Sequence, residues 1–325
     1  MIRYGGIDLG GTKIQAVVTD DRHEVLGAAR HPTPTRGGPA DVALAIVGAL
    51  RDAAAEAGAT VGDLAAVGVG SPGVVDDEAG TVTSARNLPD WEGSYDLRSK
   101  LETAFGAPVA LGNAVNVATD AEFHLGAGKP FRSMLGVFWG TGVGGALVLD
   151  GQLWAGRGAA GEIGHMCVEM GGAVCPCGRR GCMEAYAGRG AMETYARQKV
   201  DKDGAKTILF KLMEEKGKPR LASGIWARAL ERDDKLAHQI IGRAVEALGA
   251  GIGSAMNLVD TEAVIIGGGL GDRLGQPYVD KIRDAMMPHL FADHRPPEML
   301  AAALGDLGGA TGASLLAAQR APAPA

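Results

Sequence analysis

The hydrophobic pattern of this chain predicts short strands that alternate with amphipathic helices. In the strand segments, apolar residues run continuously or alternate with polar ones, and glycine-rich turns follow them. In the helical segments, apolar residues recur every three or four positions. The expected elements are strand pairs at 7–20 and 137–150, helices at 40–58, 183–200 and 239–258, and strands at 65–70 and 263–266. Strands and helices in alternation indicate an α/β fold.

The two strand pairs resemble each other, which suggests that the chain contains an internal duplication. A gapless comparison gives these equivalent residues: Gly10 and Gly140, Ala16 and Ala146, Val18 and Val148, and Asp20 and Asp150. Two unrelated glycine hairpins would also look alike, and the sequence leaves that alternative open.

Length and composition favour a folded protein of two domains that does not bind nucleic acid. The 325 residues are enough for two domains of roughly 100 to 200 residues. With 46% hydrophobic and 22% charged residues, the chain has the composition of a globular protein. The net charge is -6, and Lys and Arg are spread along the chain, so no basic stripe is available for a nucleic-acid backbone. The 51 glycines, about twice the usual share, indicate many tight turns and close backbone approaches.

The sequence suggests neither a membrane segment nor secretion. The longest apolar stretch, residues 134–149, contains five glycines and is shorter than the ~20 residues of a membrane helix, so it predicts a β-hairpin. The amino terminus lacks the basic region, apolar run and cleavage site of a signal peptide. We therefore expect a cytoplasmic protein, with a frayed tail at residues 321–325.

Three glycine-rich turns are candidate phosphate- and nucleotide-binding elements. They consist of Asp8 with Gly10, Gly11, Thr12 and Lys13; of Gly140, Thr141 and Gly142; and of Gly267, Gly268 and Gly269. In the first two turns, glycine N–H groups and a threonine hydroxyl can donate to phosphate, and Asp8 could hold a hydrated Mg²⁺. The third offers a flat backbone surface for a purine. A plain hairpin explains the first turn nearly as well, and neither a P-loop nor a Rossmann glycine pattern is present. Together the three turns suggest a nucleotide site split between two domains.

A cluster of cysteines is a candidate zinc site. His165, Cys175, Cys177 and Cys182 make a closed tetrahedral ligand set, which is typical of structural Zn²⁺. In a reducing cytoplasm such a cluster indicates metal before disulfide. Inert or redox-active thiols are the alternative. We interpret Cys167, which lies in an alternating run, as a small core residue and only secondarily as a ligand.

The residues around His165 could form hydrogen bonds with a ligand that carries vicinal hydroxyls. If His165 gives one ring nitrogen to zinc, its other N–H can donate to a ligand hydroxyl. Glu162 and Glu184 can accept from vicinal hydroxyls, and Glu184 follows Cys182 by two residues, so the zinc loop would fix its position. The alternative, which composition alone favours, is that both glutamates are solvated or cap a helix.

Three motifs carry a resemblance to a known family. They are Asp8-Leu9-Gly10-Gly11-Thr12-Lys13, Gly161-Glu162-Ile163-Gly164-His165 and Cys175-Pro176-Cys177-Gly178-Arg179-Arg180-Gly181-Cys182-Met183-Glu184. Together they resemble the ROK family of sugar kinases, and most closely its bacterial glucokinases, from Gly5 to about Leu316. The resemblance implies an actin-like (ribonuclease H-like) fold: two α/β domains with a duplicated core and an interdomain cleft. The domains would be 1–114, completed by a helix at 306–320, and 115–305, with the zinc loop at 165–182.

The resemblance also implies an activity. The enzyme would transfer the γ-phosphoryl group of ATP, with Mg²⁺, to the 6-hydroxyl of a hexose. Glucose is the first candidate substrate, and N-acetylglucosamine or mannose is the second. Such an enzyme serves glycolysis and carbohydrate metabolism, and we expect a homodimer. The first turn would surround phosphate and Mg²⁺, the second the phosphates and the third the adenosine, while zinc would brace the sugar pocket. The implied sugar ligands are Gly73, Asn87, Asn113, Glu162, His165 and Glu184.

One position departs from the family pattern. The catalytic segment of the family reads Asn-Asp-x-Asn, whereas this chain has Asn113-Ala114-Val115-Asn116, so Ala114 occupies the position of the expected aspartate base. Loss of a general base typically costs ~100- to 10,000-fold in rate, so we expect a catalytically impaired chain. The sequence fits a deliberate substitution that traps a bound state or a naturally inactive sugar sensor.

Two further alternatives concern function and donor. Transcriptional repressors of the family carry an amino-terminal helix-turn-helix, whereas here the first glycine turn begins at Asp8, so we expect a kinase scaffold. A non-enzymatic sugar-binding protein remains an alternative because of Ala114. Polyphosphate-using relatives share the same turns, so the sequence leaves the phosphate donor open.

Overall fold

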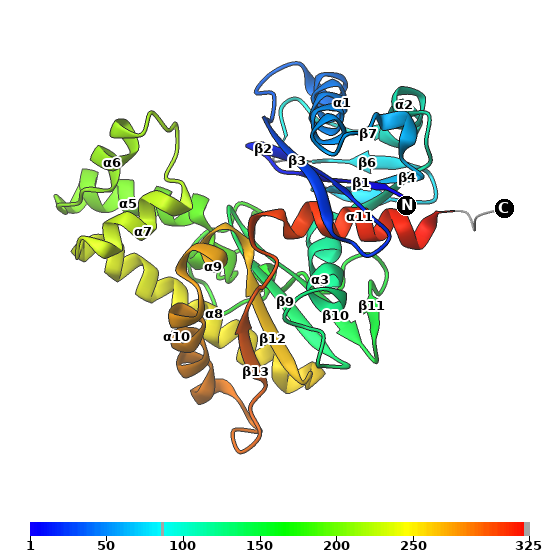
Figure 1. Cartoon of the computed structure of the whole chain (residues 1–325). Helices are drawn as coiled ribbons and strands as arrows, with labels where there is room; N and C mark the ends of the chain where they lie inside the picture. Colours follow the sequence, from blue (N-terminus) through cyan, green and yellow to red (C-terminus); the bar gives the residue numbers. More distant parts are fainter. Residues whose placement is uncertain (86–87, 322–325) are drawn as a thin grey trace. The chain divides into compact units, whose positions relative to one another are not determined.

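The computed structural model describes residues 1–85 and 88–321, which form two compact units (Figure 1). Unit 1 comprises Met1–Gly126 and the chain from Leu307 onward, and unit 2 comprises Ala127–Asp306. Unit 1 extends to Gly126, where we expected the small domain to end at residue 114, because α3 (Ala114–His124) packs against α11 (Gly308–Arg320). Asn87 of the expected sugar site and residues 322–325 of the expected frayed tail lie outside the described residues.

Unit 1 is built around a five-stranded sheet with helices on both faces. Its remaining elements are β1 (Tyr4–Leu9), β2 (Lys13–Thr19), β3 (Val25–Pro32), α1 (Gly38–Glu56), a 3₁₀ turn (Val61–Asp63), β4 (Ala66–Ser71), β5 (Val74–Asp76), β6 (Thr81–Thr83), β7 (Ser94–Asp96), α2 (Leu97–Phe105), β8 (Val109–Asn113) and a 3₁₀ turn (Gly305–Leu307) that leads into α11. The strand order is β3-β2-β1-β4-β8, with β1, β4 and β8 parallel, and β5, β6 and β7 form a separate small sheet. Because β1, β4 and β8 are parallel, their carboxyl ends meet at one edge of the sheet.

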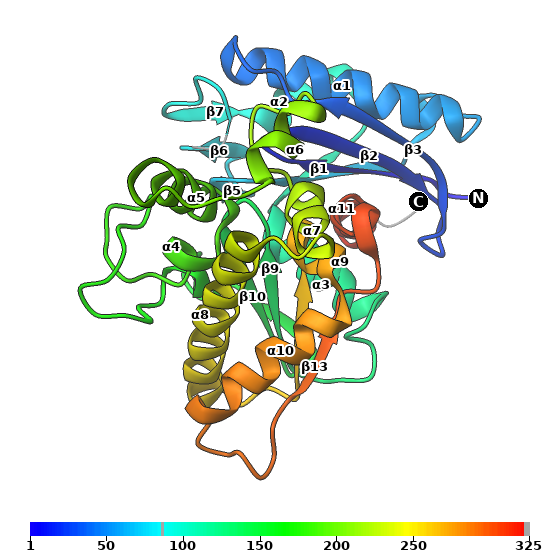
Figure 2. The same cartoon turned by 90° about the vertical axis from the view of Figure 1, so that its left-hand side faces the viewer.

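Helix α11 lies directly on this sheet because two glycines remove side chains at the contact. A Cβ atom at Gly6 of β1 would lie 2.0 Å from the carbonyl oxygen of Ala310, and one at Gly68 of β4 would lie 1.8 Å from that of Ala313. Helix α1 covers the other face (Figures 1 and 2). Its Ile46 and Leu50 side chains are completely buried. Each such side chain contributes about 1.5–3 kcal/mol, so the sheet is held firmly between the two helices.

The outer edge of the sheet, strand β8, is closed by side chains. The N–H of Val109 donates to Glu102 Oε1 at 3.1 Å, and the N–H of Leu111 donates to Asp77 Oδ1 at 2.9 Å. Two carboxylates thus take the positions that a further strand would occupy.

Unit 2 repeats the central sheet and adds more helices. Its elements are β9 (Met134–Trp139), β10 (Val143–Leu149), β11 (Gln152–Trp154), a 3₁₀ turn (Ile163–His165), α4 (Glu184–Ala187), α5 (Arg189–Asp203), α6 (Leu209–Glu215), α7 (Ser223–Glu231), α8 (Lys235–Val259), β12 (Ala263–Gly267), α9 (Gly268–Leu274), α10 (Gln276–Met286), a 3₁₀ turn (Met287–His289) and β13 (Glu298–Ala301). The long helix α8 runs beside α10 (Figure 2), and a Cβ at its Gly249 would lie 2.6 Å from the carbonyl carbon of Ala285. The core includes the buried Trp139 and Trp226.

The two sheets confirm the duplication. The strand order in unit 2 is β11-β10-β9-β12-β13, which corresponds to β3-β2-β1-β4-β8 in unit 1. In each sheet the first two pairs are antiparallel and the last two are parallel. The gapless comparison is wrong beyond the turn, however. Leu9 pairs with Ile14, whereas its counterpart Trp139 pairs with Val143, so the second turn is one residue shorter. The structural equivalent of Ala16 is therefore Gly145 rather than Ala146, and Val18 and Asp20 shift in the same way.

The other predicted elements are found with small shifts in their ends. The helices expected at 40–58 and 239–258 correspond to α1 and α8, and the stretch 134–149 is the predicted hairpin. The helix expected at 183–200 is divided by Gly188 into α4 and α5. Among the residues described, no helix combines the length and apolar character that a membrane crossing requires.

Candidate active site

The first glycine turn connects β1 to β2 in a closed loop. The N–H of Gly10 donates to the carbonyl oxygen of Lys13 at 2.9 Å, and the hydroxyl of Thr33 donates to that of Gly10 at 2.6 Å. Gly11 and Thr12 are exposed at the tip. The loop is therefore held at its base and open at its tip, which suits contact with a ligand. Thr33, from the end of β3, is a supporting residue that the sequence did not reveal.

Asp8, one residue before the end of β1, is closely surrounded by protein. A Cβ atom at Gly309, in the first turn of α11, would lie 2.9 Å from Asp8 Oδ2, so only glycine fits beside this carboxylate. Burial raises the pKa of Asp8, and the charge of Lys13 offsets part of that rise. A carboxylate whose charged form is disfavoured in this way gains from a nearby cation, which fits the expected Mg²⁺.

Ala114 and Asn113 lie at the same edge of the unit 1 sheet as Asp8. The pairing registers place Asp8 beside Gly70 of β4, and Gly70 beside Gly112 of β8. Ala114 is the first residue of α3, and Asn113 caps that helix by accepting from the N–H groups of Val115 and Asn116 at 3.0 and 3.4 Å. The side-chain NH₂ of Asn113 remains the group that can donate to a ligand.

Gly73, the third expected residue at this edge, occupies a position that requires glycine. Its φ of 89° is in the left-handed region, and a Cβ would lie 2.7 Å from the carbonyl oxygen of Thr83. Its backbone can therefore approach a ligand without an intervening side chain.

In unit 2 the structure brings the four expected metal ligands together. The ligand atoms of His165, Cys175, Cys177 and Cys182 all lie within 4.8 Å of one another. The Sγ atoms of Cys177 and Cys182 are 3.7 Å apart, and Cys175 Sγ is 3.9 Å from His165 Nδ1. Thiolates bound at ~2.3 Å to one tetrahedral Zn²⁺ are about 3.8 Å apart, so the cluster fits zinc.

The thiols of the cluster differ in acidity. Burial raises the pKa of Cys175 to about 12 and raises that of Cys182 as well. A hydrogen bond from the N–H of Arg179 lowers the pKa of Cys177 to about 6. A cation at the centre would favour the thiolate of all three.

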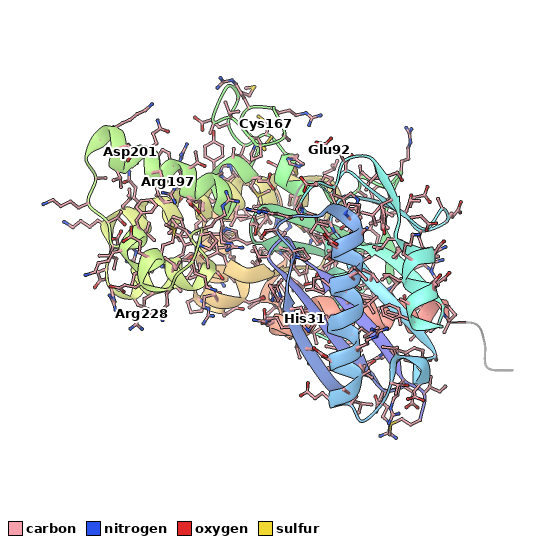
Figure 3. All side chains as sticks on the ribbon, turned by 90° about the horizontal axis from the view of Figure 1, so that it is seen from above. His31, Glu92, Cys167, Arg197, Asp201 and Arg228 are labelled. Atoms are coloured by element: carbon pink, nitrogen blue, oxygen red, sulfur yellow. The ribbon has the colours of Figure 1, made fainter. Side chains whose placement is uncertain are left out.

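Cys167 is not the core residue that we expected. Its side chain is exposed (Figure 3), and its Sγ lies 3.9 Å from the carbonyl oxygen of Arg180. The residue belongs to an isolated bridge with Cys182 and not to a packed sheet, which explains why its alternating pattern did not indicate burial.

The two glutamates near the cluster have different surroundings. Glu162 is exposed, and its Oε2 lies 3.9 Å from His165 Nε2, the ring nitrogen that faces away from the cysteines. Glu184 Oε2 accepts from the N–H of Val143 at 2.9 Å, and its Oε1 lies 3.9 Å from Cys175 Sγ. Glu184 therefore links the zinc loop to the second glycine turn, a contact that the sequence did not indicate.

The second and third glycine turns are neighbours in unit 2. The register places Gly267 of β12 beside Phe138 of β9, two residues before Gly140. The second turn is closed by the N–H of Gly140, which donates to the carbonyl oxygen of Gly142 at 2.9 Å. In the third turn, a Cβ atom at Gly269 would meet only the side chain of Ser223, with the Oγ at 3.5 Å. Thr141 and Gly269 are exposed on these turns, whereas Gly267 is buried.

The expected residues thus form two groups, one in each unit. Unit 1 holds the first glycine turn, Gly73, Asn113 and Ala114, and unit 2 holds the other two turns, the zinc cluster, Glu162 and Glu184.

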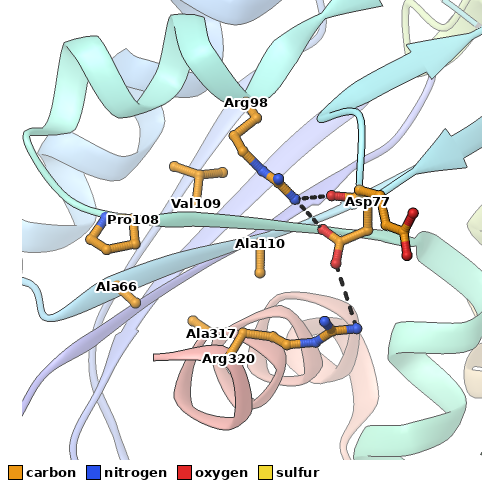
Figure 4. Close-up of a pocket in the computed structure, with 9 residues that line it drawn as sticks. Ala66, Asp77, Arg98, Pro108, Val109, Ala110, Ala317 and Arg320 are labelled. Carbon is orange, nitrogen blue, oxygen red and sulfur yellow. Dashed lines mark hydrogen bonds and ion pairs between the residues drawn. The ribbon is translucent and has the colours of Figure 1, made fainter. Parts of the chain in front are cut away.

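One pocket of unit 1 lies away from this site. Its volume is about 360 Å³, and it is lined by Ala66 and Val109 at the amino ends of β4 and β8, opposite to the edge that carries Asp8. Asp77 lies between Arg98 and Arg320 there, with an Oδ2 to Nη2 distance of 3.5 Å to Arg320 (Figure 4). Asp77 pairs with both arginines, and the acidic Glu78 also lines this pocket, so its charges are mixed and indicate no single class of ligand.

The duplicated α/β units, the glycine turns after equivalent strands and the His/Cys₃ cluster define the actin-like fold of sugar kinases. The chain belongs to the ROK family, whose family model matches residues 4–320.

Named relatives cover nearly the whole chain. A glucokinase of Streptomyces coelicolor is 34% identical, over 98% of this chain and 98% of its own length. An N-acetyl-D-glucosamine kinase of Salmonella gallinarum is 30% identical, over 96% of this chain and 98% of its own. The crystal structure of a ROK family glucokinase from Streptomyces griseus, in complex with glucose and AMPPNP, superimposes with a TM-score of 0.84 at 33% identity and covers 98% of this chain and 99% of that one.

Proposed function

We propose that this chain is an ATP-dependent hexokinase that transfers the γ-phosphoryl group to the 6-hydroxyl of a hexose, most readily glucose. The observation that carries the proposal is the His/Cys₃ cluster, because it holds His165 Nε2 and the carboxylate of Glu184 beside a glycine turn in one unit. Relatives named glucokinase, including one solved with glucose and AMPPNP, support it. The relative named N-acetyl-D-glucosamine kinase makes that sugar the second candidate substrate.

In this proposal each unit offers groups that can form hydrogen bonds with a sugar. His165 Nε2 and the Asn113 amide donate to hydroxyls, while Glu162 accepts from them. Glu184 keeps one oxygen on the N–H of Val143 and offers the other. Gly73 and Asn87 are the remaining two residues that we assign to sugar binding.

The bound cofactors supply charge and structure. The glycine turns would hold the ATP phosphates, Gly267 to Gly269 would lie against the adenosine, and Asp8 would hold Mg²⁺, which would supply positive charge to the transferred group. Structural zinc would keep His165 and Glu184 in place. We further propose a cytoplasmic homodimer whose product enters glycolysis; light scattering on the purified chain tests the oligomeric state.

We also propose that Ala114 leaves the chain without its general base. The side chain at this position is half-buried, at the first turn of α3 and beside β4, the strand that lies next to the one carrying Asp8. Its methyl group cannot accept the hydroxyl proton. A carboxylate here would be favoured by the helix N-terminus, so the backbone can accept an aspartate.

The test is a coupled assay of glucose 6-phosphate formation by the chain as it is and by Ala114→Asp. We expect slow turnover in the first and a gain of at least about 100-fold in kcat in the second. Ala114→Asn, with the same shape but no base, is the matched control and should stay slow. If aspartate leaves the rate unchanged while glucose and ATP both bind, the assignment of the base is wrong.

A further inference from the structure

Arg189 lies at the second glycine turn, outside every motif identified in the sequence. It is the first residue of α5, and its N–H donates to the carbonyl oxygen of Gly140 at 3.2 Å. Its Nη2 donates to Thr141 Oγ1 at 2.8 Å. The backbone of Arg189 is thereby fixed to the turn, and its guanidinium contacts the threonine hydroxyl. Since that hydroxyl accepts from Arg189, its own proton remains available for another acceptor.

The guanidinium of Arg189 lacks an anionic partner. Within residues 1–85 and 88–321, its buried Nε has no hydrogen-bond partner, and no carboxylate forms an ion pair with it. Burial lowers the pKa of Arg189 and the charge of Arg220 lowers it further, while the charge of Glu193 offsets part of this shift. A guanidinium remains charged at any physiological pH, so a half-buried positive charge is only partly compensated here.

The nearest acid, Glu193, is occupied by other groups. Its Oε1 accepts from Arg197 Nη2 at 2.8 Å, and its Oε2 accepts from the N–H of Leu221 at 2.9 Å. Arg220 Nε lies 3.9 Å from the same Oε2. Two arginines therefore pair with this buried carboxylate, and Arg189, which forms no ion pair with it, keeps its positive charge next to Thr141.

We propose that Arg189 contacts the phosphate groups of the phosphoryl donor at the second glycine turn, together with the hydroxyl of Thr141. The ligand chemistry is that of a nucleoside di- or triphosphate, whose oxygens would take the donors that the protein leaves without a partner. This inference rests on the proposed function and adds to it a residue that determines affinity for the donor. Arg220 contributes charge to the same region without being fixed by the turn.

Calorimetry with ATP, ADP and adenosine tests the proposal without requiring turnover. For Arg189→Gln we expect about 10- to 100-fold weaker binding of ATP, a smaller loss for ADP, and unchanged affinity for adenosine and glucose, because a charge-assisted hydrogen bond is lost. Arg189→Lys should recover part of the ATP affinity, since it keeps the charge but not the planar fork.

The matched control is Arg228→Gln. Arg228 lies on α7, is exposed (Figure 3) and pairs with Glu231 at 3.5 Å, so this variant removes the same charge away from the turn and should bind ATP as the unmodified chain does.

The possible results separate this inference from the proposed function. If the unmodified chain binds ATP and Arg189→Gln binds it equally well, the role of Arg189 is overturned and the kinase proposal stands. If Arg189→Gln loses affinity for adenosine and glucose to the same degree as for ATP, Arg189 is a structural brace and the inference fails. If the unmodified chain binds no ATP, the proposed donor and this inference both fail. Should Arg189→Gln not fold, Arg189→Lys decides: an unchanged affinity for ATP overturns the proposal.

Discussion

Asp8 should make the metal-free protein less stable at neutral pH than it would be with a neutral side chain. Burial raises the pKa of this carboxyl above its usual value of 3.8. Such a group stabilises the fold while it is protonated, and this contribution is lost as the pH rises through its folded-state pKa. Asp8→Asn, which keeps the shape beside Gly309 but removes the charge, should therefore raise the melting temperature at pH 7.

The expected size follows from the cost of a buried charge without full compensation. We expect about 1 to 3 kcal/mol, because Lys13 offsets only part of the burial. For a unit of roughly 150 residues, this corresponds to a rise of about 3 to 10 °C. The gain should shrink as the pH falls towards 3.8, where the carboxyl of the unmodified chain is itself protonated. Saturating Mg²⁺ should narrow the difference, since a cation stabilises the ionised form.

Scanning calorimetry at several pH values, without divalent metal, measures this directly. Asp20→Asn is the matched control, because Asp20 lies at the other end of β2 and its Oδ1 accepts from the N–H groups of Arg22 and Glu24 at 2.9 Å each. It should show no gain. A lower melting temperature for Asp8→Asn at pH 7, or a difference that does not vary with pH, would refute the reasoning. Turnover should fall in Asp8→Asn even as stability rises, as expected of a functional group that costs stability.

Three further results are expected. Chelation of zinc should lower the melting temperature and weaken glucose binding together, since the metal site is coupled to folding; metal analysis that finds no zinc in carefully prepared protein would remove this expectation. Glucose should bind to the chain as it is, no more than about tenfold more weakly than to Ala114→Asp, because one hydrogen bond contributes roughly 0.5–1.5 kcal/mol; calorimetry without binding at millimolar glucose would contradict the pocket assignment. Gly142→Ala places a Cβ 2.2 Å from Glu184 Oε2, so it should break the bond to Val143 and lower both the melting temperature and the affinity for ATP. Gly242→Ala, where a Cβ meets no atom within 4 Å, should do neither.

The sequence predicted elements where one local signal decides them. Apolar residues at helical spacing located α1 and α8, and the glycine-interrupted run located the β9–β10 hairpin. These segments could be found because the residues on the buried face of each recur at one regular spacing. The division of the helix at Gly188 was missed. That glycine has extended backbone, and the N–H of the next residue, Arg189, bonds to Gly140 nearly fifty positions earlier. No local pattern reports such a tertiary constraint.

The same limit applies to the candidate site. The His/Cys₃ cluster could be predicted because cysteine and histidine at this spacing have few other uses. The bond between Glu184 and the N–H of Val143, the crowding of Asp8 by Gly309 and the contact of Arg189 with Thr141 each join distant segments. A gapless comparison of the two hairpins also failed, because a turn that is one residue shorter changes the pairing while the composition stays similar.

The carboxylates on strand β8 restrict how copies of this chain can assemble. Strands of two molecules join into one continuous sheet only where unpaired N–H groups are available along an edge. The N–H groups of Val109 and Leu111 already donate hydrogen bonds to the carboxylates of Glu102 and Asp77. A second molecule, or a misfolded one during expression, would have to displace two charged groups before it could add a strand here. We therefore expect the proposed homodimer to use a surface other than this edge, and the edge itself to resist growth into aggregates.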